Sequence, residues 1–254
     1  MLVVISPAKK LSVEGEKPDW FTTPQFAEYS EKLIKELKKY NPTKLKKLMS
    51  ISDDLAQLNV ERYQQWSINH DAKNSKQALF TFTGEVYAGL NATSFKKKEL
   101  EYAQQHLRIL SGLYGVLKPM DAIHAYRLEM GTKLKIGKKS NLYEFWGDII
   151  VNEINKVMKA NGDKVLVNLA SNEYFKAVNK KKLATPIITP VFKDFSNGQY
   201  KTVMVYAKKA RGAMAAFIMK NKIKTIKELT AFDTDGYLFN EEASSPKKLV
   251  FLRN

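Results

Sequence analysis

The chain has 254 residues, of which 44% are hydrophobic and 27% charged, a composition typical of globular proteins that excludes disordered, collagen-like and coiled-coil chains. No apolar stretch reaches the roughly 18 residues that span a bilayer, and no basic segment precedes the apolar residues 1–6, so we expect neither a membrane span nor a signal peptide. The absence of cysteine excludes disulfides and thiolate chemistry, which fits a cytoplasmic protein.

Positive charge is unevenly distributed along the chain. Lys and Arg total 42 against 26 Asp and Glu, a formal net charge of +16, and residues 176–227 hold thirteen basic side chains and one acid, Asp194. Such a segment repels itself, and a polyanion such as nucleic acid relieves the repulsion. Lysine outnumbers arginine 37 to 5, a bias that codon usage also produces. The arginines are stronger candidates for anion binding because guanidinium forms paired hydrogen bonds; they are Arg62, Arg108, Arg127, Arg211 and Arg253.

The first half of the chain alternates short apolar runs with helical patterns. Apolar side chains at three- and four-residue spacing predict helices, and short continuous apolar runs predict buried strands. Pro42 and Gly84 mark ends of elements, and Ser52 has the character of a helix cap. The expected elements are a strand at 2–6, helices at 24–40, 43–49 and 55–66, a strand at 78–83, a helix at 93–106 and a strand at 107–110.

The second half continues the alternation without an internal repeat. Ser196-Asn197-Gly198 has the character of a hairpin turn. The expected elements are a helix at 141–160, a strand at 165–169, hairpin strands at 187–192 and 200–206, a helix at 207–219 and strands at 236–239 and 249–252. A true Rossmann chain would alternate more regularly. We therefore predict one compact α/β domain over residues 1–254, with a mixed sheet flanked by helices.

Polar clusters directly follow several predicted strands. Open α/β sheets place ligand sites beyond the carboxyl ends of their strands, so these clusters are candidates for lining one cleft. Each also has an ordinary alternative role, since glycines permit tight turns and Ser171 is a normal helix cap. The candidate pocket residues are Ser6, Glu85, Tyr87, Arg127, Asn168, Ser171 and Glu173.

Three basic residues, Lys208, Lys209 and Arg211, are expected in the first turn of the alanine-rich helix. Free backbone N–H groups at a helix start favour anions, whereas basic side chains there oppose the helix dipole. A phosphate bound between them would offset that cost. The alternative is a solvated helix end along which the lysine stems lie.

Signals for other chemistry are weaker. Glu144 and Asp148 lie four residues apart on one predicted helix face, as a general acid/base pair would, but structural pairing of carboxylates with Arg127 is the favoured alternative. The three histidines lack metal-ligand spacing. The sequence contains no Walker A, GxGxxG or GxSxG motif. We therefore predict no metal and no cofactor, and identify no catalytic residue.

Several longer motifs, read together, carry a resemblance. They lie at residues 6–9, 84–90, 104–115, 126–131, 145–148, 168–175 and 206–212. From residue 1 to about residue 251 the chain resembles the YaaA family of bacterial peroxide-stress proteins. The resemblance implies a cytoplasmic protein that limits oxidative damage to DNA and protein by keeping unincorporated iron low. It also implies one α/β fold with a positively charged cleft and a helix-hairpin-helix element that binds duplex and branched DNA.

We place the helix-hairpin-helix element at about residues 43–68. Residues 55–62 would then hold the hairpin and the start of its second helix, with Asn59 at a left-handed turn position. The usual glycines are replaced by Gln57 and Asn59, so a plain helical corner is an equal alternative. Side chains expected to contact phosphate here are Lys44, Lys46, Lys47 and Arg62.

Two functions follow from these observations. The first is a peroxide-stress protein that binds duplex or branched DNA through a basic cleft, without strong sequence preference, using Lys9, Lys208, Lys209 and Arg211 together with the hairpin residues. The second is an enzyme acting on a nucleotide or nucleobase. A deep pocket holding two or more strand-end groups would favour it; those groups are Lys9, Glu85, Tyr87, Asn168 and Glu173. DNA is the expected partner and a membrane is not; catalysis and oligomeric state, a monomer included, stay open.

Overall fold

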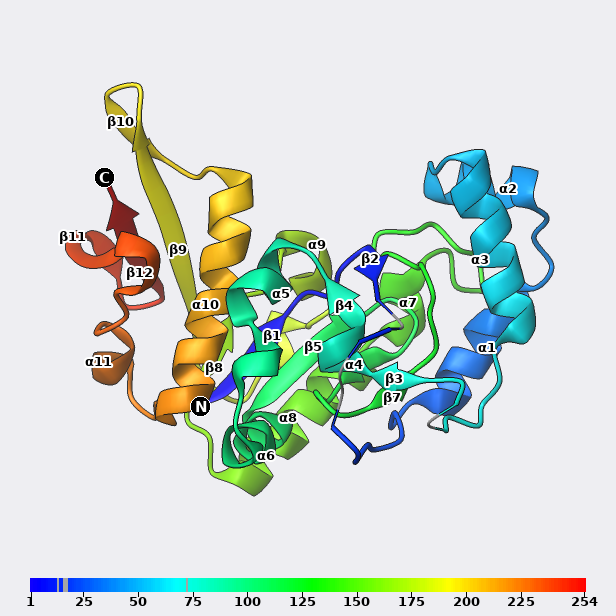
Figure 1. The fold of residues 1–254 in the computed structure, drawn as a ribbon, viewed down its shortest axis with the longest axis horizontal. Coiled ribbons are helices and arrows are strands. Elements are labelled where there is room, and N and C mark those ends of the chain that lie inside the picture. Colours follow the sequence, from blue (N-terminus) through cyan, green and yellow to red (C-terminus); the bar gives the residue numbers. More distant parts are fainter. Residues whose placement is uncertain (13, 16–17, 72) are drawn as a thin grey trace.

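The computed structural model describes residues 1–12, 14–15, 18–71 and 73–254, and its centre is a mixed sheet flanked by helices (Figure 1). The strands of this sheet are β1 (Leu2–Ile5), β5 (Leu107–Ser111), β6 (Gly115–Leu117), β8 (Leu166–Asn168), β9 (Ile187–Ser196), β10 (Gln199–Lys201), β11 (Leu238–Ser245) and β12 (Lys248–Arg253). Their order is β11-β12-β9-β8-β1-β5-β6, with β10 paired to β9. Strands β12, β9, β8, β1 and β5 are parallel, and the others are antiparallel to their neighbours. The predicted mixed α/β fold is confirmed.

Strand β1 is central to this sheet. Val3 pairs with Val167 of β8 on one side and with Leu107 of β5 on the other. All four residues of β1 are 0% exposed. A continuous apolar run suits a parallel strand covered on both faces, so the prediction of a buried first strand is confirmed.

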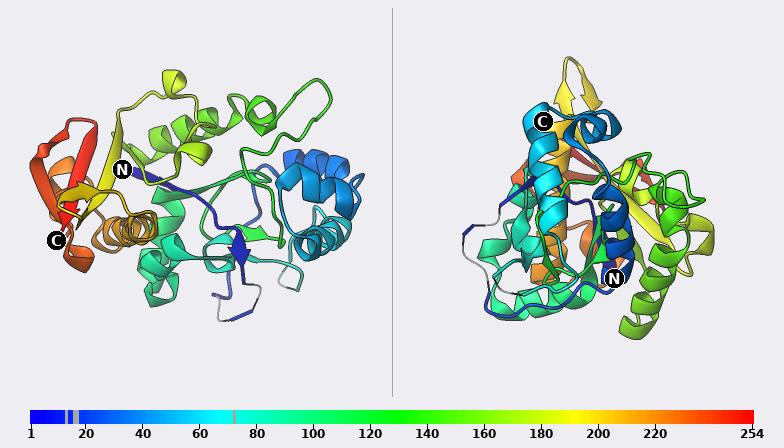
Figure 2. Two further views of the ribbon diagram at one scale, coloured as in Figure 1. Left: turned by 90° about the horizontal axis from the view of Figure 1, so that it is seen from above. Right: turned by 90° about the vertical axis from the view of Figure 1, so that its right-hand side faces the viewer.

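Helices cover both faces of the sheet. They are α1 (Ala27–Leu37), α2 (Pro42–Met49), α3 (Asp53–Gln65), α4 (Ala78–Thr81), α5 (Glu85–Leu90), α6 (Lys97–His106), α7 (Leu142–Trp146), α8 (Ile149–Asn161), α9 (Asn172–Phe175), α10 (Met204–Asn221) and α11 (Ile226–Leu229). Figure 2 (left) shows α5, α6 and α10 on one face, α7, α8 and α9 on the other, and α1 to α3 at one end. Within the described ranges, no helix has the length and apolarity needed to cross a membrane.

Short elements complete the chain. Two small ladders pair β2 (Lys10–Leu11) with β4 (Phe82–Thr83) and β3 (Lys76–Gln77) with β7 (Ala122–Ile123). Three single 3-10 turns are η1 (Ala92–Ser94), η2 (Lys180–Lys182) and η3 (Thr234–Gly236).

Helices α5 and α10 cross in backbone contact. A Cβ atom added at Gly212 would lie 1.8 Å from the Val86 carbonyl oxygen, and one added at Gly89 would lie 2.0 Å from the Lys209 carbonyl oxygen. Both distances are far below van der Waals contact, so only glycine fits at either position. Gly89 of the 84–90 motif and Gly212 of the 206–212 motif therefore fix helix packing.

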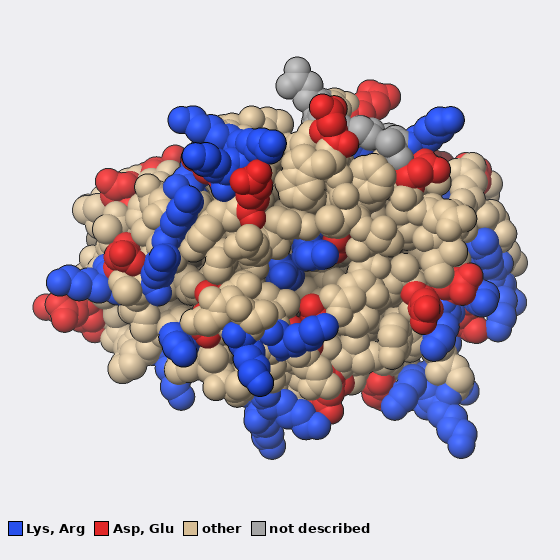
Figure 3. All heavy atoms as spheres, turned by 90° about the horizontal axis from the view of Figure 1, so that it is seen from below, with Lys and Arg blue, Asp and Glu red and all other residues tan. Residues whose placement is uncertain are grey.

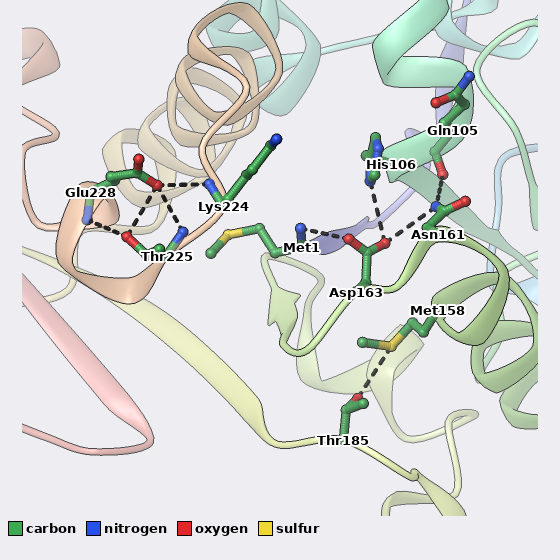
Figure 4. A network of polar contacts seen from close by, with 10 residues as sticks. All are labelled: Met1, Gln105, His106, Met158, Asn161, Asp163, Thr185, Lys224, Thr225 and Glu228. Carbon is green, nitrogen blue, oxygen red and sulfur yellow. Dashed lines mark hydrogen bonds and ion pairs between the residues drawn. The ribbon is translucent and has the colours of Figure 1, made fainter.

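The amino group of Met1 is buried at the opposite edge of the sheet from the carboxyl ends of the strands (Figure 4). It pairs with Asp163 at 2.7 Å, and the same carboxylate lies 3.3 Å from His106 Nδ1. Burial alone would raise the pKa of Asp163, but the bonds from His106 and the amino group outweigh it and lower the pKa to about 2. The charged carboxylate anchors the start of β1.

Two of the predicted strands differ from the elements found in the structure, because in each the chain becomes helical at residues whose apolar pattern indicated a strand. Residues 78–83 form α4 and the two-residue β4 where a strand was predicted, because a largely buried run has no face that distinguishes strand from helix. The predicted strand 200–206 ends at Lys201, and the alanine-rich helix begins at Met204, three residues before its predicted start. The predicted turn is confirmed, with Asn197 and Gly198 at φ 54° and 76°.

The predicted helix 141–160 is divided. Gly147 has φ 48° and ends α7, and α8 begins at Ile149. A positive φ is incompatible with a continuing right-handed helix, so a glycine inside the helical pattern marked the break.

Candidate nucleic-acid interface

Three predicted pocket residues meet where β1 and β8 end. The Ser171 backbone N–H donates to Ser6 Oγ at 2.8 Å, and the Tyr87 hydroxyl donates to the Ser6 carbonyl oxygen at 3.1 Å. The Asn168 amide oxygen accepts from the Ala170 N–H at 3.1 Å. Parallel strands bring these groups together, as predicted, but their polar atoms bond to one another. These hydrogen bonds hold the ends of β1 and β8 together.

Lys9 and Arg127 share one carboxylate beside this cluster. Lys9 Nζ lies 3.1 Å and an Arg127 Nη 3.0 Å from Glu129 Oε1, so Arg127 pairs with Glu129 and not with Glu144 or Asp148. The Tyr63 hydroxyl donates to the Arg127 carbonyl oxygen, which ties α3 to this loop. Lys9 is 67% exposed, whereas the Arg127 and Glu129 side chains are 15% exposed. Two cations on one anion leave the group with a net positive charge.

The cavity at this point is small. It measures about 10 Å³ and is lined by residues 7–9, 126–129 and 174. That is room for about one water molecule. Five strand-end groups were expected to form a nucleotide pocket, and of these Lys9 lines this cavity. Glu85 is exposed in the first turn of α5.

Glu173 fastens the loop before α7 to α9. Its Oε1 accepts from the Gly131 N–H at 2.9 Å, and its carbonyl oxygen accepts from the Tyr143 hydroxyl at 3.0 Å. Burial, with the charge of Glu173 beside it, raises the pKa of Tyr143. Between these two attachments the chain alternates buried Thr132 and Leu134 with exposed lysines. The lysines are therefore presented from an anchored loop.

Exposed lysines lie in the loop that Glu173 anchors and in the residues that follow α9. We call them the edge lysines: Lys133, Lys135, Lys138, Lys139, Lys176, Lys180 and Lys181. None of them forms an ion pair with an acidic residue in the part of the chain that the structure describes. Lys176 and Lys180 lie over the rings of Tyr143 and Phe175, at 4.9 and 5.3 Å from the ring centroids.

The carboxylates near the edge lysines are already engaged. Glu144 accepts from the Ser140 N–H and the Asn141 side chain, at 2.9 and 2.8 Å. Asp148 accepts from Lys182 Nζ at 2.6 Å and from the Asn179 side chain, and these bonds lower its pKa. Glu144 therefore accepts hydrogen bonds at the start of α7, and Asp148 pairs with Lys182. The two carboxylates do not form an acid/base pair. The local acids do not neutralise the edge lysines.

A basin of about 570 Å³ opens beside the three edge lysines that follow α9. It is lined by residues 143, 147–148, 172 and 175–181, which include Lys176, Lys180 and Lys181. Its concave floor with a lysine rim is the kind of surface that accepts a phosphate backbone. The loop lysines at 133–139 were not among the predicted contacts. Their signal in the sequence was the alternation Lys133-Leu134-Lys135-Ile136.

The hairpin was predicted at the wrong place. Helices α2 and α3 do form the two arms of a corner, but their turn is at Ser50, which has φ 52°, and Ser52 caps α3. Asn59 lies in the middle of α3, is 0% exposed, and donates to the Leu55 carbonyl oxygen at 2.7 Å. A buried side chain within a helix does not reach a phosphate. The prediction that Asn59 is a turn residue contacting phosphate is therefore wrong.

The charge of this corner is nearly balanced. Lys46 pairs with Asp53 at 2.7 Å, Lys44 and Lys47 are exposed, and Asp54 and Glu61 lie on the exposed face of α3. Burial lowers the pKa of Arg62, which lies in the last turn of α3. The corner thus presents cations and anions together.

The basic residues of α10 do not lie at its start. Because the helix begins at Met204, Lys208 and Lys209 are in its second turn, and Arg211 follows in the third. Lys209 pairs with Asp235 at 3.1 Å, Lys208 is exposed, and burial lowers the pKa of Arg211. The prediction of a first-turn anion site is wrong, because a helix extends N-terminally as far as its side chains permit.

The corner and α10 lie at opposite ends of the molecule (Figure 1). On the face seen from below, basic side chains project along the margins with acidic ones between them, and another basic group lies in a central hollow (Figure 3). On this face, positive charge is therefore not collected into one trough that joins both ends.

Buried histidines account for the remaining candidates for metal chemistry. The rings of His70 and His124 lie 4.6 Å apart between Trp66 and Tyr114. Burial lowers both pKa values, that of His70 to about 4. In the described ranges no three His, Cys, Asp or Glu side chains are placed to hold a metal ion.

Comparisons with known proteins match the whole chain. The family model described as "Peroxide stress protein YaaA" matches residues 1–243. UPF0246 proteins of Aliivibrio fischeri, strain MJ11, and of Shewanella amazonensis are each 53% identical over 254 residues, which is 100% of this chain and 98% and 99% of those proteins. A UPF0246 protein of a Marinomonas species is 51% identical over 254 residues, 97% of its own length.

Proposed function

Because this chain belongs to the peroxide stress protein YaaA family, we propose that it limits oxidative damage to DNA by lowering intracellular free iron and that it binds duplex or branched DNA without strong sequence preference. The cytoplasm is the compartment in which that role places it. The contacts proposed for DNA are the edge lysines, with Lys9, Lys208 and Arg211 as further cations.

The observation that carries the DNA proposal is the engagement of the acids around α9. Glu129, Asp148 and Glu173 each accept bonds from the protein's own cations or N–H groups. Lys176, Lys180 and Lys181 line a concave basin, and they and the exposed loop lysines at 133–139 form no ion pair with an acid within the described ranges. A polyanion that neutralises them releases its counterions, which supplies affinity without reading bases.

The use of lysine rather than arginine supports weak sequence preference. A lysine ammonium is a flexible point charge, whereas base readout in the major groove relies on two-pronged contacts such as those of arginine to guanine. Phosphate contacts position a protein on DNA and carry no sequence information directly. We expect similar affinities for duplexes of different sequence.

A salt titration with duplex DNA tests this proposal. The logarithm of the binding constant should fall linearly with the logarithm of salt concentration, with a slope of several units. Changing Lys133, Lys135 and Lys138 together to Gln should lower the steepness by about three units, since each lost phosphate contact removes about one.

The matched control is the variant with Lys156, Lys159 and Lys164 changed to Gln. These exposed lysines lie at the other edge of the sheet and give the same change in net charge. Equal slopes for the two variants would show that net charge alone attracts DNA and would refute the edge site.

The iron part of the proposal is tested in cells. A strain lacking the protein should contain more unincorporated iron, measured by electron paramagnetic resonance, and should grow more poorly in hydrogen peroxide than the same strain carrying the gene. Unchanged iron with poorer growth would refute the iron part and leave DNA binding standing.

The alternative, an enzyme acting on a nucleotide or nucleobase, draws no support from the strand-end cavity. Its volume of about 10 Å³ is below that of a ligand site by more than tenfold. The polar groups of Ser6, Ser171 and Glu173 are occupied by bonds within the protein.

A further inference from the structure

The ends of β9 and β10 form an arm that projects beyond the body of the molecule. Figures 1 and 2 both show it standing clear of the sheet, above the start of α10. Its strands are joined at Asn197 and Gly198, whose φ values of 54° and 76° fit a tight two-residue hairpin turn. The arm is therefore a defined hairpin and not a loose loop.

Two aromatic rings lie exposed side by side on the arm. Phe195 and Tyr200 are directly opposite each other in the ladder, so both point to the same face of the hairpin. Their ring centroids are 5.2 Å apart, and the residues are 52% and 38% exposed. The Tyr200 hydroxyl donates to Asn254 Oδ1 at 2.6 Å, which holds that ring in place. Large aromatic rings left exposed together indicate a binding surface.

The charge available on the arm is positive. Asp194 is the single acidic residue between positions 187 and 203 in the sequence. It is 6% exposed and is neutralised by Arg253, whose Nε and Nη lie 2.7 and 2.6 Å from its Oδ1. Lys193 is half-buried and lies two residues before Phe195, on the same face of β9 as the ring, whereas exposed Lys201 lies opposite Asp194 on the other face of the hairpin. Neither lysine pairs with an acid within the described ranges.

We propose that the arm binds unpaired bases of a nucleic acid strand, with Phe195 and Tyr200 stacking on the bases and Lys193, on the same face, contacting an adjoining phosphate. This inference rests on the proposed DNA binding and names the part of the DNA that the arm contacts. Aromatic stacking beside basic side chains is the common mode of binding to single strands.

The same features argue against other occupants. A second copy of this chain carries the same positive arm and a net charge of +16, so two arms repel each other. In an intact duplex the bases are already stacked on their neighbours, and the rings would reach them only at a gap, an end or a branch. The arm therefore selects interrupted DNA.

The test compares a blunt duplex with the same duplex carrying a single-stranded gap. In the variant with Phe195 and Tyr200 both changed to Ala, affinity for the gapped DNA should fall about tenfold or more, because stacking on one base contributes that much. Affinity for the blunt duplex should change less than about twofold. The control is Leu238→Ala, which removes an even more exposed apolar side chain, 63% exposed, from the same sheet.

Stacking has its own optical signal. A 2-aminopurine base placed in the gap should lose fluorescence on binding the unaltered protein and keep it with the double variant. Phe195→Leu keeps the arm apolar without its ring, so it serves if the double variant does not fold. It too should leave the 2-aminopurine fluorescence less quenched.

The outcomes separate the two proposals. Steep salt dependence with equal binding of gapped DNA by the variant would overturn the arm and leave DNA binding intact. No binding of either DNA by the unaltered protein would overturn both. A dimer that sedimentation detects and that the double variant dissolves would overturn the arm in favour of self-association.

Discussion

The basin around α9 and the corner formed by α2 and α3 both present several lysines, but they differ in what their acids do. At the corner Asp53 pairs with Lys46, and Asp54 and Glu61 lie exposed among the cations. Around α9 the acids bond inward, Glu173 to the Gly131 N–H and Glu144 to the Ser140 N–H. The surface potential therefore depends on the partners of the carboxylates as well as on the lysines, and those partners decide which surface attracts a polyanion.

The corner also differs in how it is held from the sheet face that α5 and α10 cover. The sheet side depends on backbone contact between α5 and α10 at Gly89 and Gly212. The corner is tied to the body by side chains, with Trp66 Nε1 donating to the Tyr114 hydroxyl at 3.0 Å and His70 packed against Tyr114. The α5–α10 contact is therefore disrupted by any atom added at its glycines. The corner contact is disrupted by protonation of His70.

The largest effect is expected from Gly212→Ala. Its methyl group would overlap the Val86 carbonyl oxygen, so α5 and α10 must separate, and we expect a loss of about 4 kcal/mol in the free energy of unfolding. Urea unfolding measures the loss. Ala216→Gly, one turn later in α10, is the control and should cost about 1 kcal/mol. A cost at Gly212 no larger than this would contradict the backbone contact.

A slightly smaller effect is expected at the corner in acid. Burial lowers the pKa of His70 to about 4, below the 6.5 of an unfolded chain, so the unfolded state binds the proton first. Its contribution is complete above pH 6.5 and is lost as the pH falls toward 4, by about 3 kcal/mol. The unfolding free energy of His70→Gln, measured in urea from pH 7 to 4, should decline by less. Parallel declines would exclude His70.

A third test compares the lysines of the two regions directly. Changing Lys133, Lys135 and Lys138 to Gln should weaken duplex binding about 100-fold at low salt, since three phosphate contacts are lost. Changing Lys44, Lys46 and Lys47 to Gln should weaken it less than about tenfold, because Lys46 already pairs with Asp53. Fluorescence anisotropy measures both. The reverse order would place DNA at the corner.

Part of the candidate site was predictable from order along the chain. The polar groups after β1 and β8 were expected to meet, and Ser6 bonds to Ser171 because parallel strands end at one edge. That Asn59 is buried, that α10 begins at Met204 and that Glu173 holds the Gly131 N–H depend on packing between distant segments. Residue type and spacing do not specify which distant groups become partners in the folded protein.

The sequence by itself determined the mixed α/β class, the buried first strand and the family, because apolar periodicity and long motifs act locally. Only the tertiary structure decided which of 42 basic side chains keep an unpaired charge. A lysine's effect depends on the nearest carboxylate in space, and folding chose those neighbours from across the chain.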